Sequence, residues 1–261
     1  THGQYLWWYA NGRACFANPE RRRLICDLHR IGMKQLEMDR SPVAEIAVIM
    51  DDRSVSAIRP NPMFWREVLL HTYAGIYPAG APFELFELNA FLERADHSKY
   101  KTVIFLNLYR LDKKILDGVN ALKSNGRTLI FMGLSGKIFD FPDGKRTVSA
   151  ANSEKLIGMK MKIESAAMPF SLWIDPDRTD FIPQKEDLRF GAEECYPGLL
   201  ESDDPTAETI AFWCNGNPGM ARKKFPDWTS VFIGGARVPD IVWRTLFKDA
   251  GVHCYAQCGD V

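Results

Sequence analysis

The sequence predicts an α/β fold built on a mainly parallel β-sheet. Nearly continuous apolar runs at 44–50, 102–108 and 128–132 have the composition of strands that are buried on both faces. Segments with apolar residues at helical spacing lie between these runs, and the connections are short. This alternation predicts βαβ units with right-handed crossovers and with helices on both faces of the sheet.

The size and charge of the chain limit its function classes. Its 261 residues are enough for one large α/β domain, or for one domain with an appendage. The 33 Lys+Arg and 33 Asp+Glu residues give a formal net charge of zero, so we expect no nucleic-acid partner. No apolar run reaches the roughly 20 residues of a transmembrane helix, so we expect no membrane partner. The start, Thr1-His2-Gly3, indicates a chain that begins inside a longer gene product or after processing.

Residues 1–40 are expected to form an N-terminal appendage of one strand and one helix. The aromatic run at 5–9 is typical of a buried strand. Asn18-Pro19 is a helix start, with Asn as the N-cap and Pro at the first helical position. Apolar residues at helical spacing extend this helix to about Asp39, and Ser41-Pro42 ends it.

Residues 41–136 carry the clearest alternation of strand and helix. The strand at 44–50 is followed by a predicted helix at 64–72 and by a second strand, or strand–helix junction, at 83–88. The strand at 102–108 leads into a helix at 112–124, for which Asn125-Gly126 is the expected C-cap. The apolar face of that helix consists of Ile115, Leu116, Val119 and Leu122.

The second half of the chain is less regular at first. Residues 139–205 are expected to form a β-rich excursion from the sheet. Its predicted elements are a short helix at 153–159 and strands at 161–165 and 171–174. Regular order then returns with strands at 210–214 and 228–233, a helix at 239–249, and a last short strand at 252–255. Residues 41–261 are therefore expected to form one α/β domain.

The first predicted strand ends in acidic residues. In an open parallel sheet, ligands bind at the carboxyl ends of the strands. The segment Asp51-Asp52-Arg53-Ser54 contains no glycine, so it is no GxGxxG dinucleotide cradle. The paired acids could hold Mg²⁺ or could cap the next segment, and we favour the cap.

The fourth predicted strand ends in Gly133-Leu134-Ser135-Gly136-Lys137. This segment lacks the first glycine and the final Ser/Thr of a P-loop. Leu134 occupies the position at which a nucleophile elbow carries Cys or Ser, and Ser135 is the nearest hydroxyl. We therefore expect no nucleophile at this turn.

Other titratable residues show no catalytic spacing. None of the histidines lies in an HxE or HExxH pattern; they are His2, His29, His71, His97 and His253. Glu45, Glu84 and Glu87 lie near predicted strands but form no evident pair for glycoside hydrolysis. The sequence thus predicts no catalytic, cofactor-binding or metal-binding residue.

Cysteine and tryptophan leave alternatives open. Cys254 and Cys258 follow His253 at CxxxC spacing, which fits a metal or redox pair, but a core Cys and a loop Cys are favoured. If the chain were a stand-alone hydrolase, Cys214 at a strand end would be the first candidate nucleophile. If it were a carbohydrate-binding module, its aromatic contacts would come from Trp7, Trp8, Trp213 or Trp228.

Three pieces of the sequence resemble the glycoside hydrolase family 42 β-galactosidases. Residues 6–9 with the helix from Asn18 resemble the last strand and helix of a (β/α)₈ barrel. Residues 41–54 are similar to the opening of that family's trimerisation domain. Residues 231–233, 239–241 and 250–260 are similar to its last helix and closing strand.

The resemblance implies a flavodoxin-like, class I glutamine-amidotransferase-like three-layer sandwich that lacks the amidotransferase cysteine. The family's two catalytic Glu residues lie on earlier barrel strands, so none is carried over to this sequence. The resemblance also implies assembly into homotrimers and a carbohydrate ligand in the complete enzyme. In such an enzyme Trp7 or Trp8 could line the sugar pocket.

Overall fold

The computed structural model describes residues 18–39, 41–57, 66–71, 75–178 and 188–256. The chain divides into two compact units, Thr1–Val43 and Ala44–Val261, which are described separately. The predicted strand at 5–9, with Trp7 and Trp8, lies outside the described residues. No helix within the described ranges is long and apolar enough to cross a membrane.

The first unit contributes helix α1, Pro19–Gln35. Asn18 Oδ1 accepts hydrogen bonds from the backbone N–H groups of Glu20 and Arg21, and Pro19 occupies the first helical position. The predicted start is confirmed, whereas the helix ends at Gln35, before the predicted Asp39. No residue of α1 is buried, and Leu24 and Ile31 are more than half exposed.

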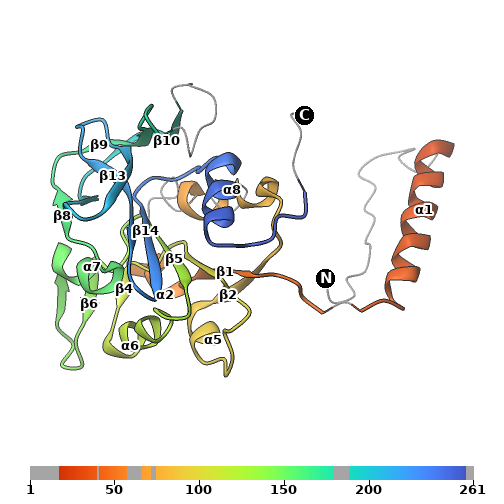
Figure 1. Cartoon of the computed structure of the whole chain (residues 1–261), viewed down its shortest axis with the longest axis horizontal. Helices are drawn as coiled ribbons and strands as arrows, with labels where there is room; N and C mark the ends of the chain where they lie inside the picture. Colours follow the sequence, from red (N-terminus) through yellow and green to blue (C-terminus); the bar gives the residue numbers. More distant parts are fainter. Residues whose placement is uncertain (1–17, 40, 58–65, 72–74, 179–187, 257–261) are drawn as a thin grey trace. The chain divides into compact units, whose positions relative to one another are not determined.

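The second unit is built around a nine-stranded sheet in the order β10-β9-β12-β13-β14-β5-β3-β1-β2 (Figure 1). The parallel part contains five strands: β2 (Phe83–Glu87), β1 (Ile46–Met50), β3 (Thr102–Phe105), β5 (Arg127–Met132) and β14 (Trp228–Ile233). The remaining four strands add in antiparallel fashion: β13 (Pro218–Lys224), β12 (Glu208–Phe212), β9 (Met168–Ile174) and β10 (Arg189–Tyr196). The predicted α/β class is confirmed, with a sheet that is mixed.

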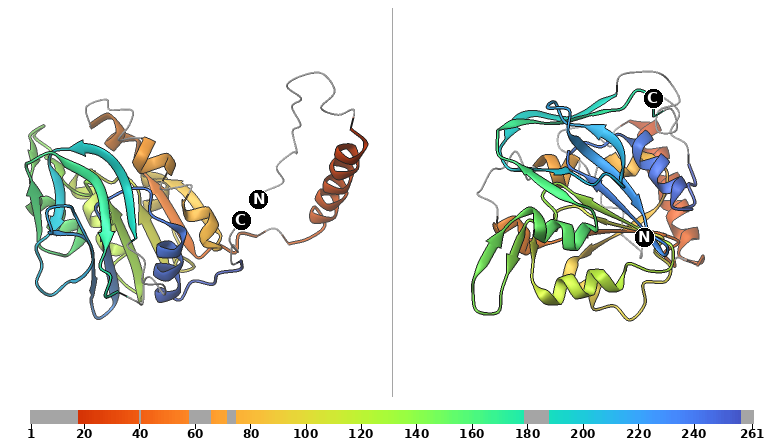
Figure 2. Two further views of the ribbon diagram at one scale, coloured as in Figure 1. Left: turned by 90° about the horizontal axis from the view of Figure 1, so that it is seen from above. Right: turned by 60° about the vertical axis from the view of Figure 1, so that its left-hand side comes forward.

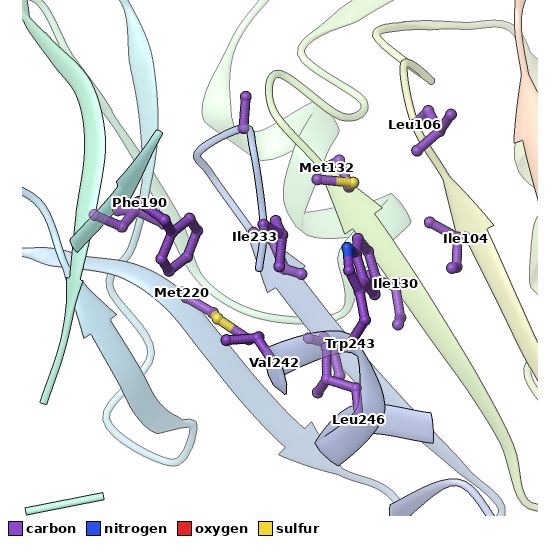
Figure 3. Close-up of a cluster of buried hydrophobic side chains, with 14 of the residues drawn as sticks. Ile104, Leu106, Ile130, Met132, Phe190, Met220, Ile233, Val242, Trp243 and Leu246 are labelled. Carbon is purple, nitrogen blue, oxygen red and sulfur yellow. The ribbon is translucent and has the colours of Figure 1, made fainter. Parts of the chain in front are cut away.

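Strands β1, β3 and β5 are buried on both faces, as their apolar runs predicted, whereas the edge strand β2 is only partly buried. Ile104 and Ile130 belong to one core cluster, whereas Val103 and Leu129 belong to the other, because successive side chains point to opposite faces. The first cluster is covered by α8 (Asp240–Asp249) and by two short turns of helix, η1 (Arg66–His71) and η2 (Tyr77–Ala79). Figure 3 shows Trp243 of α8 among the side chains of this cluster.

The opposite face is covered by α5 (Leu88–Leu92), α6 (Lys113–Ala121) and α7 (Ala150–Ile157). The second unit therefore has three layers, with helices on both sides of the sheet (Figure 2). Asp112 Oδ1 caps α6 by accepting the backbone N–H of Ile115 at 2.9 Å. Of the predicted apolar face of α6, Ile115, Val119 and Leu122 are buried and Leu116 is partly buried. The helix ends at Ala121 with Leu122 as its C-cap, so the predicted end at Ser124 with an Asn125-Gly126 cap was wrong. A further short helix, α2 (Asp52–Ala57), follows β1 directly.

The segment at 139–205 differs from the predicted excursion. Its strands β9 and β10 extend the main sheet. Its other strands lie outside the main sheet. β8 (Met161–Glu164) and β11 (Leu199–Ser202) form a two-stranded sheet, and β6 (Ile138–Asp140) and β7 (Arg146–Val148) form a three-stranded sheet with the earlier strand β4 (Arg110–Leu111).

Two predictions in the last third of the chain were wrong. The predicted strand at 252–255 has no strand pairing, and Tyr255 N–H instead donates to Gly80 O at 2.8 Å. Strand β13 was not predicted, because it begins with Pro218-Gly219 and ends in basic residues. Glycine is required at 219, since a Cβ there would lie 2.2 Å from Leu172 Cδ2 and 2.9 Å from the Trp213 ring.

Candidate functional site

The carboxyl edge of the parallel strands holds a closed hydrogen-bond network around Asp51. The Asp51 side chain is buried, and Ser54 Oγ donates to Asp51 Oδ2 at 2.5 Å. Ser54 Oγ in turn accepts the backbone N–H groups of Tyr109 and Arg110, both at 3.0 Å. Asp51 Oδ1 accepts the backbone N–H of Arg53 at 3.2 Å. The carboxylate therefore holds the turn after β1 against the chain that follows β3.

Asn107 and Arg53 complete this network. Asn107 Oδ1 accepts the N–H of Asp51 at 2.8 Å, and Asn107 Nδ2 donates to Asp51 O at 2.9 Å. The guanidinium of Arg53 lies 3.5 Å from Asp51 Oδ1 and 2.9 Å from Asp112 Oδ2. Although burial raises the pKa of Asp112, the hydrogen bonds from Ile115 N–H and Arg53 lower that pKa on balance. Of the two acids after β1, Asp51 therefore caps the following segment and links it to Ser54 and Arg53, as favoured from the sequence, whereas Asp52 is exposed.

The described residues contain no group of three or more His, Cys, Asp or Glu side chains that could hold a metal ion. The Asp51 carboxylate accepts from the backbone N–H of Arg53 and from the Ser54 hydroxyl, and the Arg53 guanidinium lies 3.5 Å away. These donors use acceptor sites of the carboxylate that a cation would otherwise contact. The neighbouring Asp52 is exposed at the start of α2.

In the turn after β5, the polar and apolar side chains are likewise engaged in contacts within the fold. Ser135 is buried, and its Oγ donates to Met132 O at 2.6 Å. Gly133 has φ +61°, and a Cβ there would lie 3.3 Å from the ring of buried Tyr109, whose pKa burial raises. Leu134 packs against the first core cluster. The hydroxyl nearest the expected elbow position is therefore used within its own turn.

The three glutamates near strands serve separate structural contacts. Glu45 pairs with Lys101 at 2.5 Å, Glu84 accepts from Tyr100 Oη at 2.7 Å, and Glu87 caps α5 by accepting Ala90 N–H at 2.9 Å. Burial raises the pKa of each carboxyl, but these hydrogen bonds outweigh it and lower the pKa on balance. None of them has the raised pKa that a general acid for glycoside hydrolysis needs.

Cys214 is exposed in the turn between β12 and β13, at the antiparallel side of the sheet. No described imidazole hydrogen-bonds its sulfur: His97 Nε2 contacts Phe91 O at 2.7 Å, and the His253 ring packs on Tyr255. His29 is exposed on α1. A base for a cysteine nucleophile is therefore not provided by these side chains.

A buried carboxylate near this turn was missed from the sequence. Glu201 accepts hydrogen bonds from Asn215 Nδ2 at 2.6 Å and Asn217 Nδ2 at 2.9 Å, and Lys162 Nζ lies 3.8 Å away. The contact holds the β12–β13 turn against β11. No sequence signal could have found it, because β11 itself was not predicted.

Two of the four tryptophans considered for a carbohydrate-binding module, Trp213 and Trp228, are not open platforms. Trp213 is buried, stacks on Phe170 and donates from Nε1 to Leu200 O at 3.1 Å. Trp228 is only 9% exposed; its ring stacks on Phe225 at 4.5 Å, and Lys123 Nζ lies 4.9 Å from the ring centroid. Trp7 and Trp8 lie outside the described residues.

The chain shares its fold with part of several solved β-galactosidases. The structure from Bacillus circulans sp. alkalophilus has a TM-score of 0.59 and 18% sequence identity to this chain. The match covers 89% of this chain and 35% of the β-galactosidase chain. The structure from Rahnella sp. R3 has a TM-score of 0.63 at 14% identity, with the same coverages of 89% and 35%. The family 42 enzyme Gan42B from G. stearothermophilus, as its E323A mutant, has a TM-score of 0.59 at 15% identity and covers 87% and 33%.

The chain thus spans about a third of the length of the β-galactosidases it matches. At these identities the likeness shows a common fold. No protein-family model and no curated protein sequence matches the chain.

Proposed function

We propose that this chain is a non-catalytic accessory domain of a multidomain glycoside hydrolase related to the family 42 β-galactosidases. The observation that carries the proposal is the closed network at the carboxyl edge of β1, β3 and β5. Asp51, Ser54 and Ser135, which could have provided chemistry there, hold one another or the backbone. Active sites of open parallel sheets lie at this edge, so its closure favours a structural role.

The comparison supports the same proposal. Structures described as β-galactosidases share the fold over 86–89% of this chain, whereas the chain covers 33–35% of theirs. The proposed parent enzyme would act on β-galactoside-type sugars through residues outside this chain. Trp7 or Trp8 would contact sugar only in that complete enzyme.

The order of the parallel strands supports a flavodoxin-like, class I glutamine-amidotransferase-like domain. In chain order the five parallel strands are β1, β2, β3, β5 and β14, and their order across the sheet is β2-β1-β3-β5-β14. This is the 2-1-3-4-5 order of doubly wound flavodoxin-like sheets. Leu134 then follows the strand after which an amidotransferase carries its nucleophile, which agrees with an accessory role.

The first unit supports a place within a larger enzyme. Helix α1 buries none of its own residues, although Leu24 and Ile31 are large and apolar. Most helices in proteins are stabilised by the packing of an apolar face. Because residues 6–9 and the helix from Asn18 resemble the last strand and helix of a (β/α)₈ barrel, we assign the first unit to the end of a catalytic barrel.

The glycoside assay tests the catalytic part of the proposal. The purified chain is expected to release no nitrophenol from 4-nitrophenyl β-D-galactoside or other nitrophenyl glycosides above the buffer rate. Among the residues that the structure describes, Glu45, Glu84 and Glu87 serve separate structural contacts and form no pair for hydrolysis. A complete family 42 β-galactosidase at the same molar concentration serves as the positive control. Saturable turnover by this chain would overturn the proposal, and Cys214→Ser would then show whether the cysteine is its nucleophile.

Self-association is the second part of the proposal. We expect the purified chain to form a homotrimer at high concentration, as the resemblance to the trimerisation domain implies. Multi-angle light scattering over a range of protein concentrations measures the mass. A species that stays at the 29.7 kDa of one chain throughout would contradict self-association and would leave the glycoside result untouched.

A further inference from the structure

A half-enclosed cavity of about 180 Å³ lies beneath the C-terminal end of α8, on the face of the sheet that carries the first core cluster. Thr128 of β5 and Thr229 of β14 line it and are direct partners in the parallel register. Val231 and Leu246, both buried, form its apolar wall. The cavity lies at the amino ends of β5 and β14, away from the closed network at their carboxyl ends.

Several polar side chains that line the cavity have no side-chain hydrogen bond or ion pair with another described residue. Within the described part of the chain, the hydroxyls of Thr128 and Thr229 and the ammonium of Lys224 make no side-chain hydrogen bond or ion pair. Thr128 as a whole has 6% of its surface exposed, and its side chain lines the cavity. A hydroxyl that is open to a cavity can both donate and accept a hydrogen bond to a ligand there.

A charged network places a carboxylate at the rim. Arg222 Nη1 is hydrogen-bonded to Asp249 Oδ2, and Arg222 Nε donates to Glu208 Oε2 at 2.7 Å. Glu208 is also paired with Arg178 Nη2 at 3.0 Å. Arg222 thus holds Asp249 in place, and the second carboxylate oxygen of Asp249 faces no protein donor within the described residues.

The chemistry of this lining selects a class of ligand. An ammonium donates, a carboxylate accepts and a threonine hydroxyl does both, so together they match a molecule whose own groups donate and accept. Asp249 and the carbonyl end of α8 disfavour an anion, whereas Arg222 and Lys224 disfavour a cation. The volume is that of about six waters at roughly 30 Å³ each.

We propose that this cavity binds a neutral polyhydroxylated small molecule of about the size of a monosaccharide. Its hydroxyls replace the waters on Thr128, Thr229, Lys224 and Asp249, and its C–H face packs on Val231 and Leu246. The site goes beyond the proposed accessory role, and its test does not depend on glycosidase activity.

Saturation-transfer NMR and calorimetry on the whole chain test the site with four separate probes: D-galactose, D-glucose, myo-inositol and inorganic phosphate. We expect saturable millimolar binding of at least one neutral probe and none of phosphate. Thr128→Val and Lys224→Met should each weaken binding about fivefold, the effect of one lost hydrogen bond. Lys248→Met removes the same charge from the end of α8, outside the lining, and should bind as the wild type does.

Three outcomes would overturn the proposal. In the first, no neutral probe binds saturably. In the second, a neutral probe binds, but Thr128→Val and Lys224→Met leave its affinity unchanged. In the third, phosphate binds more tightly than the neutral probes, and Lys224→Met abolishes that binding. The last would indicate an anion site. Circular dichroism confirms folding of each variant, and Thr229→Val replaces Thr128→Val if the buried substitution unfolds the chain.

Discussion

Replacing Trp243 with alanine is expected to lower the free energy of unfolding by about 3–5 kcal/mol. The indole is fully buried in the first core cluster, where its ring stacks on Phe247 with a centroid distance of 5.7 Å. Figure 3 places it beside Ile130 of the central strand β5. Truncation removes the apolar contacts that hold α8 on the sheet and leaves a cavity that the surrounding strands cannot fill. Urea denaturation followed by far-UV circular dichroism measures the loss.

Trp173→Ala is the matched control for this experiment. Trp173 lies on β9 with 37% of its surface exposed, and its ring contacts the Arg189 guanidinium at 4.6 Å from the centroid. We expect a loss of about 1 kcal/mol, because little apolar surface returns to water and the cation–π contact is partly solvated. Equal losses for the two tryptophans would show that α8 is not anchored through Trp243.

Replacing Asp51 with asparagine is expected to lower the free energy of unfolding by about 2–3 kcal/mol. The two side chains have nearly the same shape, so the effect reports hydrogen bonding. Asp51 accepts from Arg53 N–H and from Ser54 Oγ–H on separate oxygens. The amide offers one acceptor and one donor group, which leaves a buried donor facing a donor. The same urea titration measures this loss.

Asp52→Asn provides the control at the next position. Asp52 is exposed at the start of α2, and its substitution should change the unfolding free energy by no more than about 0.5 kcal/mol. The double variant with Ser54→Ala should lose clearly less than the sum of the two single losses, because both residues belong to one network. Additive losses would contradict the network as described.

The strands of the parallel half were predictable because their burial is uniform. The apolar runs at 44–50, 102–108 and 128–132 need no knowledge of their neighbours, since most of their apolar side chains enter one core cluster or the other. The helix cap Asn18 is a local contact within three residues, so it too was predicted from the sequence.

The antiparallel half was not predictable in the same way. Strand β13 contains Arg222 and Lys223, which look like a solvated segment until their partners are known. Their charges are neutralised by Glu208, Asp249 and Asp204, which come from other elements. β10 is bulged between Gly191 and Cys195, which breaks the alternation by which a strand is recognised.

The sequence by itself determined the α/β class, the buried parallel strands and the position of Leu134 where a nucleophile would be expected, because each depends on residues that are neighbours in the chain. Only the tertiary structure decided that Asp51, Ser54 and Asn107 close the strand edge, and that Thr128, Thr229 and Asp249 meet around one cavity. These groups come together from segments far apart in the chain. The hydrogen bonds among Asp51, Ser54 and Asn107 depend on distances of about 3 Å, which no spacing in the sequence specifies.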